Sequence, residues 1–194
     1  MKLFSAQNIT YSINENKLFH NLSFDVNSGE GLHIKGGNGS GKSTLLRIIL
    51  GITSPSKGLI QSFDQDLKIS YLGHKNAIKN YLTPIENLEL LFSGDDLNVA
   101  FEWLNKFGLS HVQDELTASL SFGQQKKLAL IRVLAQSSDL LILDEPFVGL
   151  DQATADQLNS FLAQKISQNA GLILTSHITP MIDCAVLDLG AKNA

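Results

Sequence analysis

Cysteine is nearly absent from the chain of 194 residues, since Cys184 is the only one. A single cysteine forms neither an internal disulfide framework nor a cysteine-based zinc site, which favours a reducing compartment. Long apolar runs are also missing, because "LLRIIL" and "LLIL" fall well short of the roughly 18 residues of a membrane span. Polar residues interrupt the opening "MKLFSAQNITYSINEN", so it does not resemble a secretory signal. We therefore expect no direct membrane insertion.

Clustered basic residues are lacking as well. The 15 Lys and Arg are outnumbered by 19 Asp and Glu, which gives a formal net charge of −4. Neutralising the phosphates of a nucleic acid requires clustered Lys and Arg, so we expect no nucleic-acid partner. Apolar residues at 43% and charged residues at 18% are typical of a globular protein. At this length, we predict one domain with a substantial core.

Strand and helix patterns divide the chain into a core and an insertion. Residues 3–35 predict short strands, and "LLILDE" and "GLILTSH" predict buried strands later in the chain. Between about 75 and 136 the apolar spacing is helical, and Thr83 with Glu86 predicts a capping box at a helix start. We therefore predict an α/β fold. Its core spans about 1–74 and 137–194, and the insertion is a helical subdomain.

A glycine-rich segment carries the clearest chemical signal. "GGNGSGKS" fits the pattern G-x-x-x-x-G-K-[ST] between a predicted strand and a predicted helix, which is the context of a phosphate-binding loop. Glycines let backbone N–H groups approach an anion, Lys42 would reach the β- and γ-phosphates, and the Ser43 hydroxyl would bind Mg²⁺. The alternative is a glycine-rich turn with an exposed lysine. The predicted nucleotide-binding residues here are Gly36, Gly37, Asn38, Gly39, Ser40, Gly41, Lys42, Ser43 and Thr44.

Two carboxylates, Asp144 and Glu145, follow the apolar run "LLIL". Four consecutive apolar residues indicate a strand buried on both faces, and ligands bind at the carboxyl ends of such strands. Asp144 is predicted to hold the magnesium ion, and Glu145 to polarise a water molecule as general base. The alternative for Glu145 is an exposed acid at a strand end. Together with the glycine-rich loop, this pair predicts a nucleoside triphosphatase.

The segment "LSFGQ" adds a third motif. Ser121 and Gln124 predict a capping box, and a helix start offers N–H groups and a positive dipole end to an anion. With the two motifs above, the segment resembles the LSGGQ signature of ATP-binding cassette (ABC) ATPases. Leu120, Ser121, Gly123 and Gln124 match that signature, and Phe122 replaces its first glycine.

Further positions follow the order of the ABC family. The resemblance implies that Tyr11 stacks on adenine, that Asp151 belongs to the D-loop, and that the switch histidine His177 contacts the γ-phosphate. The alternative role for Tyr11, ordinary packing within its strand, stays open. His74 stands where most of the family has a glutamine that joins the nucleotide site to a membrane subunit. Imidazole can exchange one hydrogen bond with water, and its protonation changes near neutral pH.

The segment "YLGHKNAIKNYLTPIENLELL" narrows the resemblance to the ATPase subunits of cytochrome c maturation, described as heme exporters. This resemblance implies ATP hydrolysis with Mg²⁺, in which Lys42, Glu145 and His177 are catalytic. It also implies a homodimer, formed at least transiently with ATP, in which residues 121–124 complete the partner's site. Transmembrane transporter subunits would be the further partners, with the chain attached peripherally at the cytoplasmic face of the inner membrane.

Two other functions stay open. An ATPase subunit of a different small ABC transporter would keep the catalytic residues and change only the membrane partner. A nucleotide-gated module that dimerises with little turnover is supported only by Phe122 and His74, and the intact catalytic residues argue against it.

Other polar and aromatic residues are interpreted as structural. Lys126 and Lys127 predict a solvated helix face, Trp103 predicts packing in the helical subdomain, and His33 predicts a surface or satisfied histidine.

Overall fold

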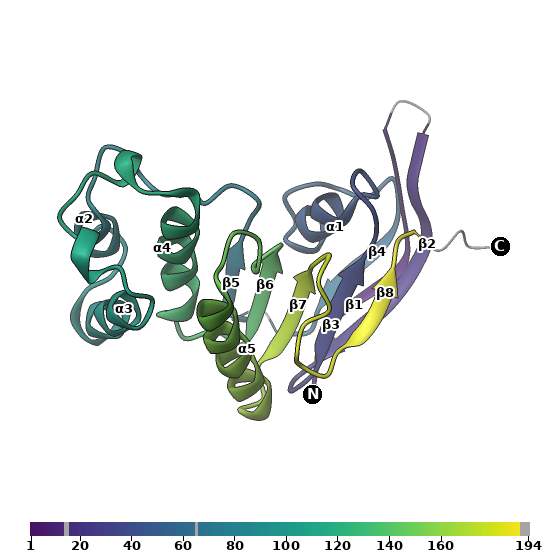
Figure 1. The fold of residues 1–194 in the computed structure, drawn as a ribbon. Coiled ribbons are helices and arrows are strands. Elements are labelled where there is room, and N and C mark those ends of the chain that lie inside the picture. Colours follow the sequence, from purple (N-terminus) through teal and green to yellow (C-terminus); the bar gives the residue numbers. More distant parts are fainter. Residues whose placement is uncertain (14–15, 65, 191–194) are drawn as a thin grey trace.

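Two β-sheets with helices packed on them form the fold of the computed structural model, which describes residues 1–13, 16–64 and 66–190 (Figure 1). The smaller sheet is antiparallel, in the order β2-β1-β4, and the larger sheet is parallel, in the order β5-β6-β7-β3-β8. The strands are β1 (Lys2–Ile13), β2 (Asn16–Asn27), β3 (Gly31–Lys35), β4 (Lys57–Ser62), β5 (Ile69–Leu72), β6 (Leu140–Asp144), β7 (Gly171–Thr175) and β8 (Ala185–Asp188). The helices are α1 (Lys42–Ile49), α2 (Pro84–Glu89), α3 (Gly94–Lys106), α4 (Phe122–Leu134) and α5 (Gln152–Ser167), with 3₁₀ turns η1 (Ser110–Val112) and η2 (Thr117–Ser119). The predicted α/β class is confirmed.

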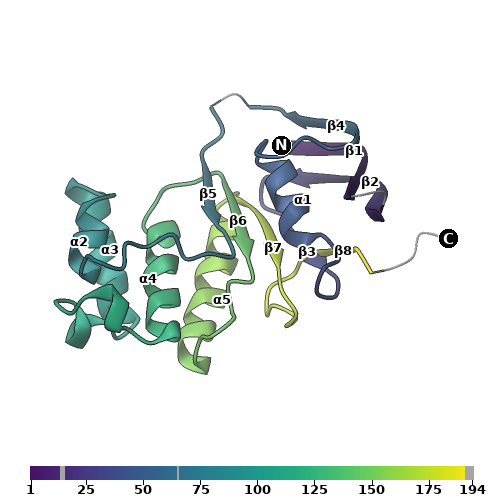
Figure 2. The same ribbon diagram turned by 90° about the horizontal axis from the view of Figure 1, so that it is seen from above.

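The parallel sheet is buried on both faces, as the apolar run in β6 predicts. Leu140 and Ile142 belong to a core cluster with residues of α1, β1 and β2, whereas Leu141 and Leu143 belong to a second cluster with residues of α4 and α5. Figure 2 shows α1 between the two sheets and α4 and α5 on the other side of the parallel sheet. Because β3, β6 and β7 run parallel, their carboxyl ends meet at one edge of the sheet.

Helices α2, α3 and α4 lie between β5 and β6 in the sequence and gather at one end of the molecule (Figures 1 and 2). Trp103 of α3 packs against Phe107 and, edge to face, against Phe161 of α5, with ring centroids 5.2 and 5.3 Å away. The packing role predicted for Trp103 is thus confirmed. Within the described ranges, no helix combines the length and the apolar character that crossing a bilayer takes.

The first two strands are longer than the short strands that the sequence predicts. β1 and β2 have 12 residues each and pair with several shifts of register. Asn8 and Asn21 adopt positive φ angles, both of 54°, next to such shifts. Each shift changes which face a side chain occupies, so the alternation that marks one long strand is broken in the sequence.

Candidate functional site

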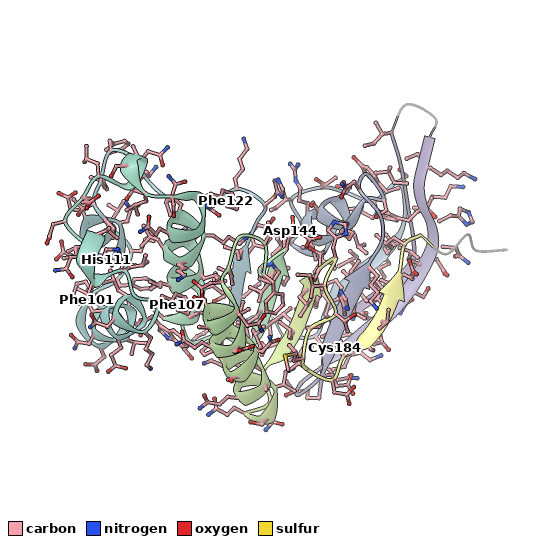
Figure 3. The ribbon with its side chains drawn as sticks, viewed as in Figure 1. Phe101, Phe107, His111, Phe122, Asp144 and Cys184 are labelled. Atoms are coloured by element: carbon pink, nitrogen blue, oxygen red, sulfur yellow. The ribbon has the colours of Figure 1, made fainter. Side chains whose placement is uncertain are left out.

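A cavity of about 550 Å³ opens at the carboxyl ends of β3 and β6. Residues 37–44 form one wall, and Asp144, Glu145 and His177 form the facing wall. Figure 3 labels Asp144 at the end of β6. The structure therefore brings together the glycine-rich loop, the two carboxylates and the switch histidine, which lie far apart in the sequence. His74 and Asn76 also line this cavity.

The glycine-rich loop needs glycine at specific positions. Gly39 and Gly41 have φ angles of 79° and 95°, in the left-handed region that side chains disfavour. Gly41 is the N-cap of α1 and supplies no side-chain cap, so the positive end of the helix faces the cavity. The Lys42 ammonium donates hydrogen bonds to the carbonyls of Gly36 and Gly37, at 2.8 and 3.3 Å. This cationic, N–H-rich concavity suits a polyphosphate.

The carboxylate wall has acceptors that lack hydrogen-bond donors. Asp144 is 1% exposed, and its Oδ1 accepts a hydrogen bond of 2.7 Å from the Thr175 hydroxyl. Among the described residues, Asp144 Oδ2 and Glu145 Oε1 are buried without a hydrogen-bond partner. A buried carboxylate oxygen without a donor suits a divalent cation, and a second one suits a water molecule. Together with Ser43 on the loop, this donor set fits Mg²⁺.

Glu145 lies between the Lys42 ammonium and the His177 side chain. Its Oε1 is 3.8 Å from Lys42 Nζ and 3.4 Å from His177 Nε2, and its Oε2 accepts a hydrogen bond of 3.2 Å from the His177 backbone N–H. Neither of the first two contacts is a hydrogen bond, so Oε1 remains available as a proton acceptor. Glu145 also has a φ of 48°, which is unusual for a residue other than glycine. Its carboxylate can accept a proton from a water molecule in the cavity.

The prediction that Lys126 and Lys127 lie on a solvated helix face is wrong. The Lys126 side chain lines the cavity from α4, and the residue is only 3% exposed. Burial lowers the pKa of Lys126, while the nearby charges of Asp144 and Glu145 act in the opposite direction. Lys127 is partly buried as well, and its ammonium donates a hydrogen bond to the Phe107 carbonyl. The polar pattern of the segment did not reveal that α3 and β5 pack against α4.

The signature residues occupy the start of α4, apart from most of the cavity. Ser121 Oγ accepts a hydrogen bond from the Gln124 N–H, and Gln124 Oε1 accepts one from the Ser121 N–H, so the predicted capping box is present. Leu120 is buried in the core cluster that the helices share with the parallel sheet, and of the five signature residues only Phe122 lines the cavity. Phe122 is 62% exposed, and Figure 3 labels it at the start of α4. A Cβ atom added at Gly149 would lie 2.5 Å from Cε1 of the Phe122 ring.

Two other predicted residues lie away from the cavity wall. Asp151 caps α5 by accepting hydrogen bonds from the Thr154 N–H and hydroxyl, both of 2.8 Å. The Tyr11 ring stacks on Phe19 at 6.1 Å, its partner in the β1–β2 pairing, and this contact supports the packing interpretation. Ile13 and Leu18 line the cavity instead. Sequence reasoning missed both, although Ile13 lies two residues after Tyr11 in the same strand.

Comparison with known proteins places the chain in a family. The model of the ABC transporter family matches residues 19–148, which is more than half of the chain. The chain belongs to the ABC transporter family. This ABC ATPase is 38% identical over 172 residues to the cytochrome c biogenesis ATP-binding export protein CcmA of Idiomarina loihiensis, covering 82% of this chain and 78% of the relative. It is 36% identical over 188 residues to the protein of the same name from Escherichia coli K12, covering 91% and 90%.

Solved structures agree with this assignment. An inward-facing putative metal-chelate type ABC transporter is 30% identical with a TM-score of 0.78, covering 97% of this ABC ATPase and 80% of that chain. A dimeric ATP-binding cassette in a post-hydrolysis state, bound to ADP and Pi, is 25% identical with a TM-score of 0.76, covering 91% and 88%. The family therefore identifies the activity as ATP hydrolysis.

Proposed function

We propose that this ABC ATPase powers a separate membrane subunit in cytochrome c biogenesis, with heme export as the process. The observation that carries the proposal is the similarity to two cytochrome c biogenesis ATP-binding export proteins, which covers 91% of the chain in the better case. His74 supports it too, because its imidazole lines the cavity at the position where most ABC ATPases have the amide side chain of glutamine. The assignment concerns the partner and the cargo, since the ATPase site itself would serve any transporter of the family.

The cavity residues divide the work of hydrolysis. Lys42 and the N–H groups of the loop bind and orient the phosphates, and Ser43 and Asp144 hold Mg²⁺. When bound, Mg²⁺ supplies positive charge that offsets the charge on the transferring phosphoryl group. Glu145 Oε1 accepts the proton of the attacking water, and His177 holds the other oxygen of the same carboxylate through its backbone N–H. His177 is also proposed to contact the γ-phosphate.

The proposed working state is a head-to-tail homodimer. Ser121, Gly123 and Gln124 do not line the cavity of their own chain, so we assign them to the ATP bound by the partner. The capped start of α4 suits this role, because it turns a positive helix end toward an anion. A dimeric cassette bound to ADP and Pi, to which this chain is similar, supports such closure.

The membrane partner is proposed to dock on residues 74–92, at the start of the predicted helical subdomain of about 75–136. Tyr81, Leu90 and Leu91 in this segment are exposed although large and apolar. Such a surface suits a protein partner. The chain would then work peripherally, at the cytoplasmic face of the inner membrane.

The test compares the wild-type chain with Glu145→Gln, by ATP turnover and by size-exclusion chromatography in ATP and Mg²⁺. Wild type is expected to hydrolyse ATP, and Glu145→Gln to retain ATP and elute as a dimer. If neither protein hydrolyses or dimerises, repeating the assay with co-expressed membrane subunits decides between a required partner and a nucleotide-gated module. Co-purification with the membrane subunits of another small transporter, rather than those of cytochrome c biogenesis, would contradict the proposed process.

A further inference from the structure

Thr175 connects the two carboxylates of the site through one buried hydroxyl. It is the last residue of β7, it is 0% exposed, and it lies opposite Asp144 in the pairing of β6 with β7. Its Oγ1 lies 2.7 Å from Asp144 Oδ1 and 2.9 Å from the backbone nitrogen of Glu145. A single side chain thus contacts the last residue of β6 and the residue that follows it.

The direction of both hydrogen bonds is fixed by chemistry. An ionised carboxylate only accepts and a backbone N–H only donates, so the Thr175 hydroxyl must donate to Asp144 and accept from Glu145. The donated bond engages Asp144 Oδ1. Asp144 Oδ2 is then the oxygen left buried without a hydrogen-bond partner among the described residues, on a side chain that lines the cavity.

The accepted bond acts on the backbone of Glu145. This residue has a φ of 48°, and its N–H is shared between the Thr175 hydroxyl at 2.9 Å and the Thr175 carbonyl at 3.2 Å. A strained backbone conformation persists only where its surroundings hold it. Here the shared bond holds the turn that directs the Glu145 carboxylate toward His177 and Lys42.

We propose that Thr175 is a positioning residue of the ATPase site, which orients Asp144 toward Mg²⁺ and holds Glu145 in its left-handed conformation. The inference rests on the proposed function. A β-branched residue is expected at the end of a strand for conformational reasons alone, and valine would meet that need equally well. Only the hydroxyl distinguishes threonine from valine, so the hydroxyl is the group to test.

Thr175→Val removes the hydroxyl and keeps the shape, whereas Thr175→Ser keeps the hydroxyl. Thr117→Val is the matched control, because Thr117 is also 0% exposed and its hydroxyl accepts a hydrogen bond from Asn87, in the helical subdomain. Binding of the non-hydrolysable analogue AMP-PNP is measured by calorimetry on the full chain, once with Mg²⁺ and once with EDTA. Thermal unfolding of each variant checks that it is folded.

In EDTA, we expect Thr175→Val to bind AMP-PNP as tightly as the wild type does. Mg²⁺ should increase the affinity of the wild type for AMP-PNP, and this increase should be about tenfold smaller in Thr175→Val. A tenfold effect is the size expected for the loss of a hydrogen bond to a charged group. The kcat of Thr175→Val should fall more than its KM rises, because Glu145 is also released. Thr175→Ser should stay within about twofold of the wild type, and Thr117→Val should lose stability without changing the Mg²⁺ effect.

An unchanged Mg²⁺ effect in Thr175→Val, or an equal loss in Thr175→Ser, would overturn the inference and leave the proposed function intact. The binding measurement needs no turnover, so it holds even if hydrolysis requires the membrane partner. A wild-type chain without any Mg²⁺-dependent binding of AMP-PNP would overturn the proposed function and this inference together.

Discussion

Lys127 Nζ lies 2.6 Å from Asp151 Oδ2, so α4, which begins with the signature residues, is tied to the loop that caps α5. The hydrogen bond from Lys127, followed by those from the Thr154 N–H and hydroxyl, lowers the pKa of Asp151 below its ordinary value of 3.8. The pair joins two elements that the sequence analysis assigned to different motifs, the signature and the D-loop.

The first prediction concerns this pair. In a double-mutant cycle of Lys127→Met and Asp151→Asn, we expect a coupling of about 0.5–1 kcal/mol in the free energy of unfolding, because the carboxylate is half exposed and solvent screens the charge. Since folding lowers the pKa of Asp151, its stabilisation is complete above about pH 5, begins to fall near pH 3.8, and is lost as the pH falls through the lower folded-state pKa. Urea unfolding at pH 7 and pH 3 measures both effects. A coupling that does not weaken at all between pH 7 and pH 3 would contradict an ionic origin.

Features encoded by neighbouring residues could be predicted from the sequence. Strand, glycine-rich loop and helix follow one another directly, and both capping boxes, at Thr83 and Ser121, join residues three positions apart. The hydrogen bonds of both capping boxes are local, so the residues that form them can be predicted from their spacing alone. The loop and the two helix starts were accordingly placed correctly.

Features that depend on distant packing could not be predicted. Thr175 and Asp144 are 31 positions apart, and only the pairing of β6 with β7 brings their side chains together. Lys126 looks like a surface residue because its neighbours are polar, yet its side chain lies in the cavity wall beside the carboxylates. The cavity wall at Ile13 likewise depends on how β1 and β2 are aligned across several shifts of register.

The second prediction compares three glycines of the phosphate-binding loop. A Cβ atom at Gly37 or Gly39 would meet nothing within 4 Å, whereas at Gly41 it would lie 3.0 Å from the Phe19 ring. Gly39 and Gly41 have positive φ angles of 79° and 95°. We expect Gly37→Ala to change the free energy of unfolding by less than about 0.5 kcal/mol, Gly39→Ala to lower it by about 1 kcal/mol, and Gly41→Ala by about 2 kcal/mol or more.

Urea unfolding without nucleotide measures this series, so that lost ligand contacts do not contribute. Gly37→Ala serves as the internal control, because it adds a methyl group without conformational strain. Equal losses in all three variants would show that neither the φ angle nor the space at the Phe19 ring determines the choice of glycine.

The third prediction separates capping from catalysis at Ser121. Ser121→Ala and Thr83→Ala each remove the side-chain acceptor of a capping box and should each lower the free energy of unfolding by about 1 kcal/mol. Only Ser121→Ala should reduce ATP turnover, because only Ser121 is assigned to the partner's nucleotide. Ser121→Asp should recover the stability, since aspartate caps a helix well, but not the turnover, since its charge repels phosphate. Recovery of turnover in Ser121→Asp would mean that Ser121 acts only as a cap.

The fourth prediction concerns His33, a buried histidine on β3 whose Nε2 lies 3.0 Å from the Ser176 carbonyl oxygen. The acceptor fixes the assignment, since a carbonyl can only accept and Nε2 must therefore carry the proton. This bond joins the strand that leads into the phosphate-binding loop to the residue that precedes His177. His33 is thus the satisfied histidine that the sequence analysis allowed for, and it holds two parts of the site together.

His33→Leu leaves the Ser176 carbonyl without this donor and should lower the free energy of unfolding by about 1–3 kcal/mol. His33→Gln keeps an N–H donor of similar reach and should recover at least half of that loss. Because the bond lies beside His177, turnover should fall in His33→Leu and rise again in His33→Gln, in parallel with stability. If both variants lose the same stability, the fit of the imidazole ring in the core outweighs its hydrogen bond, and the link between β3 and the switch histidine carries little energy.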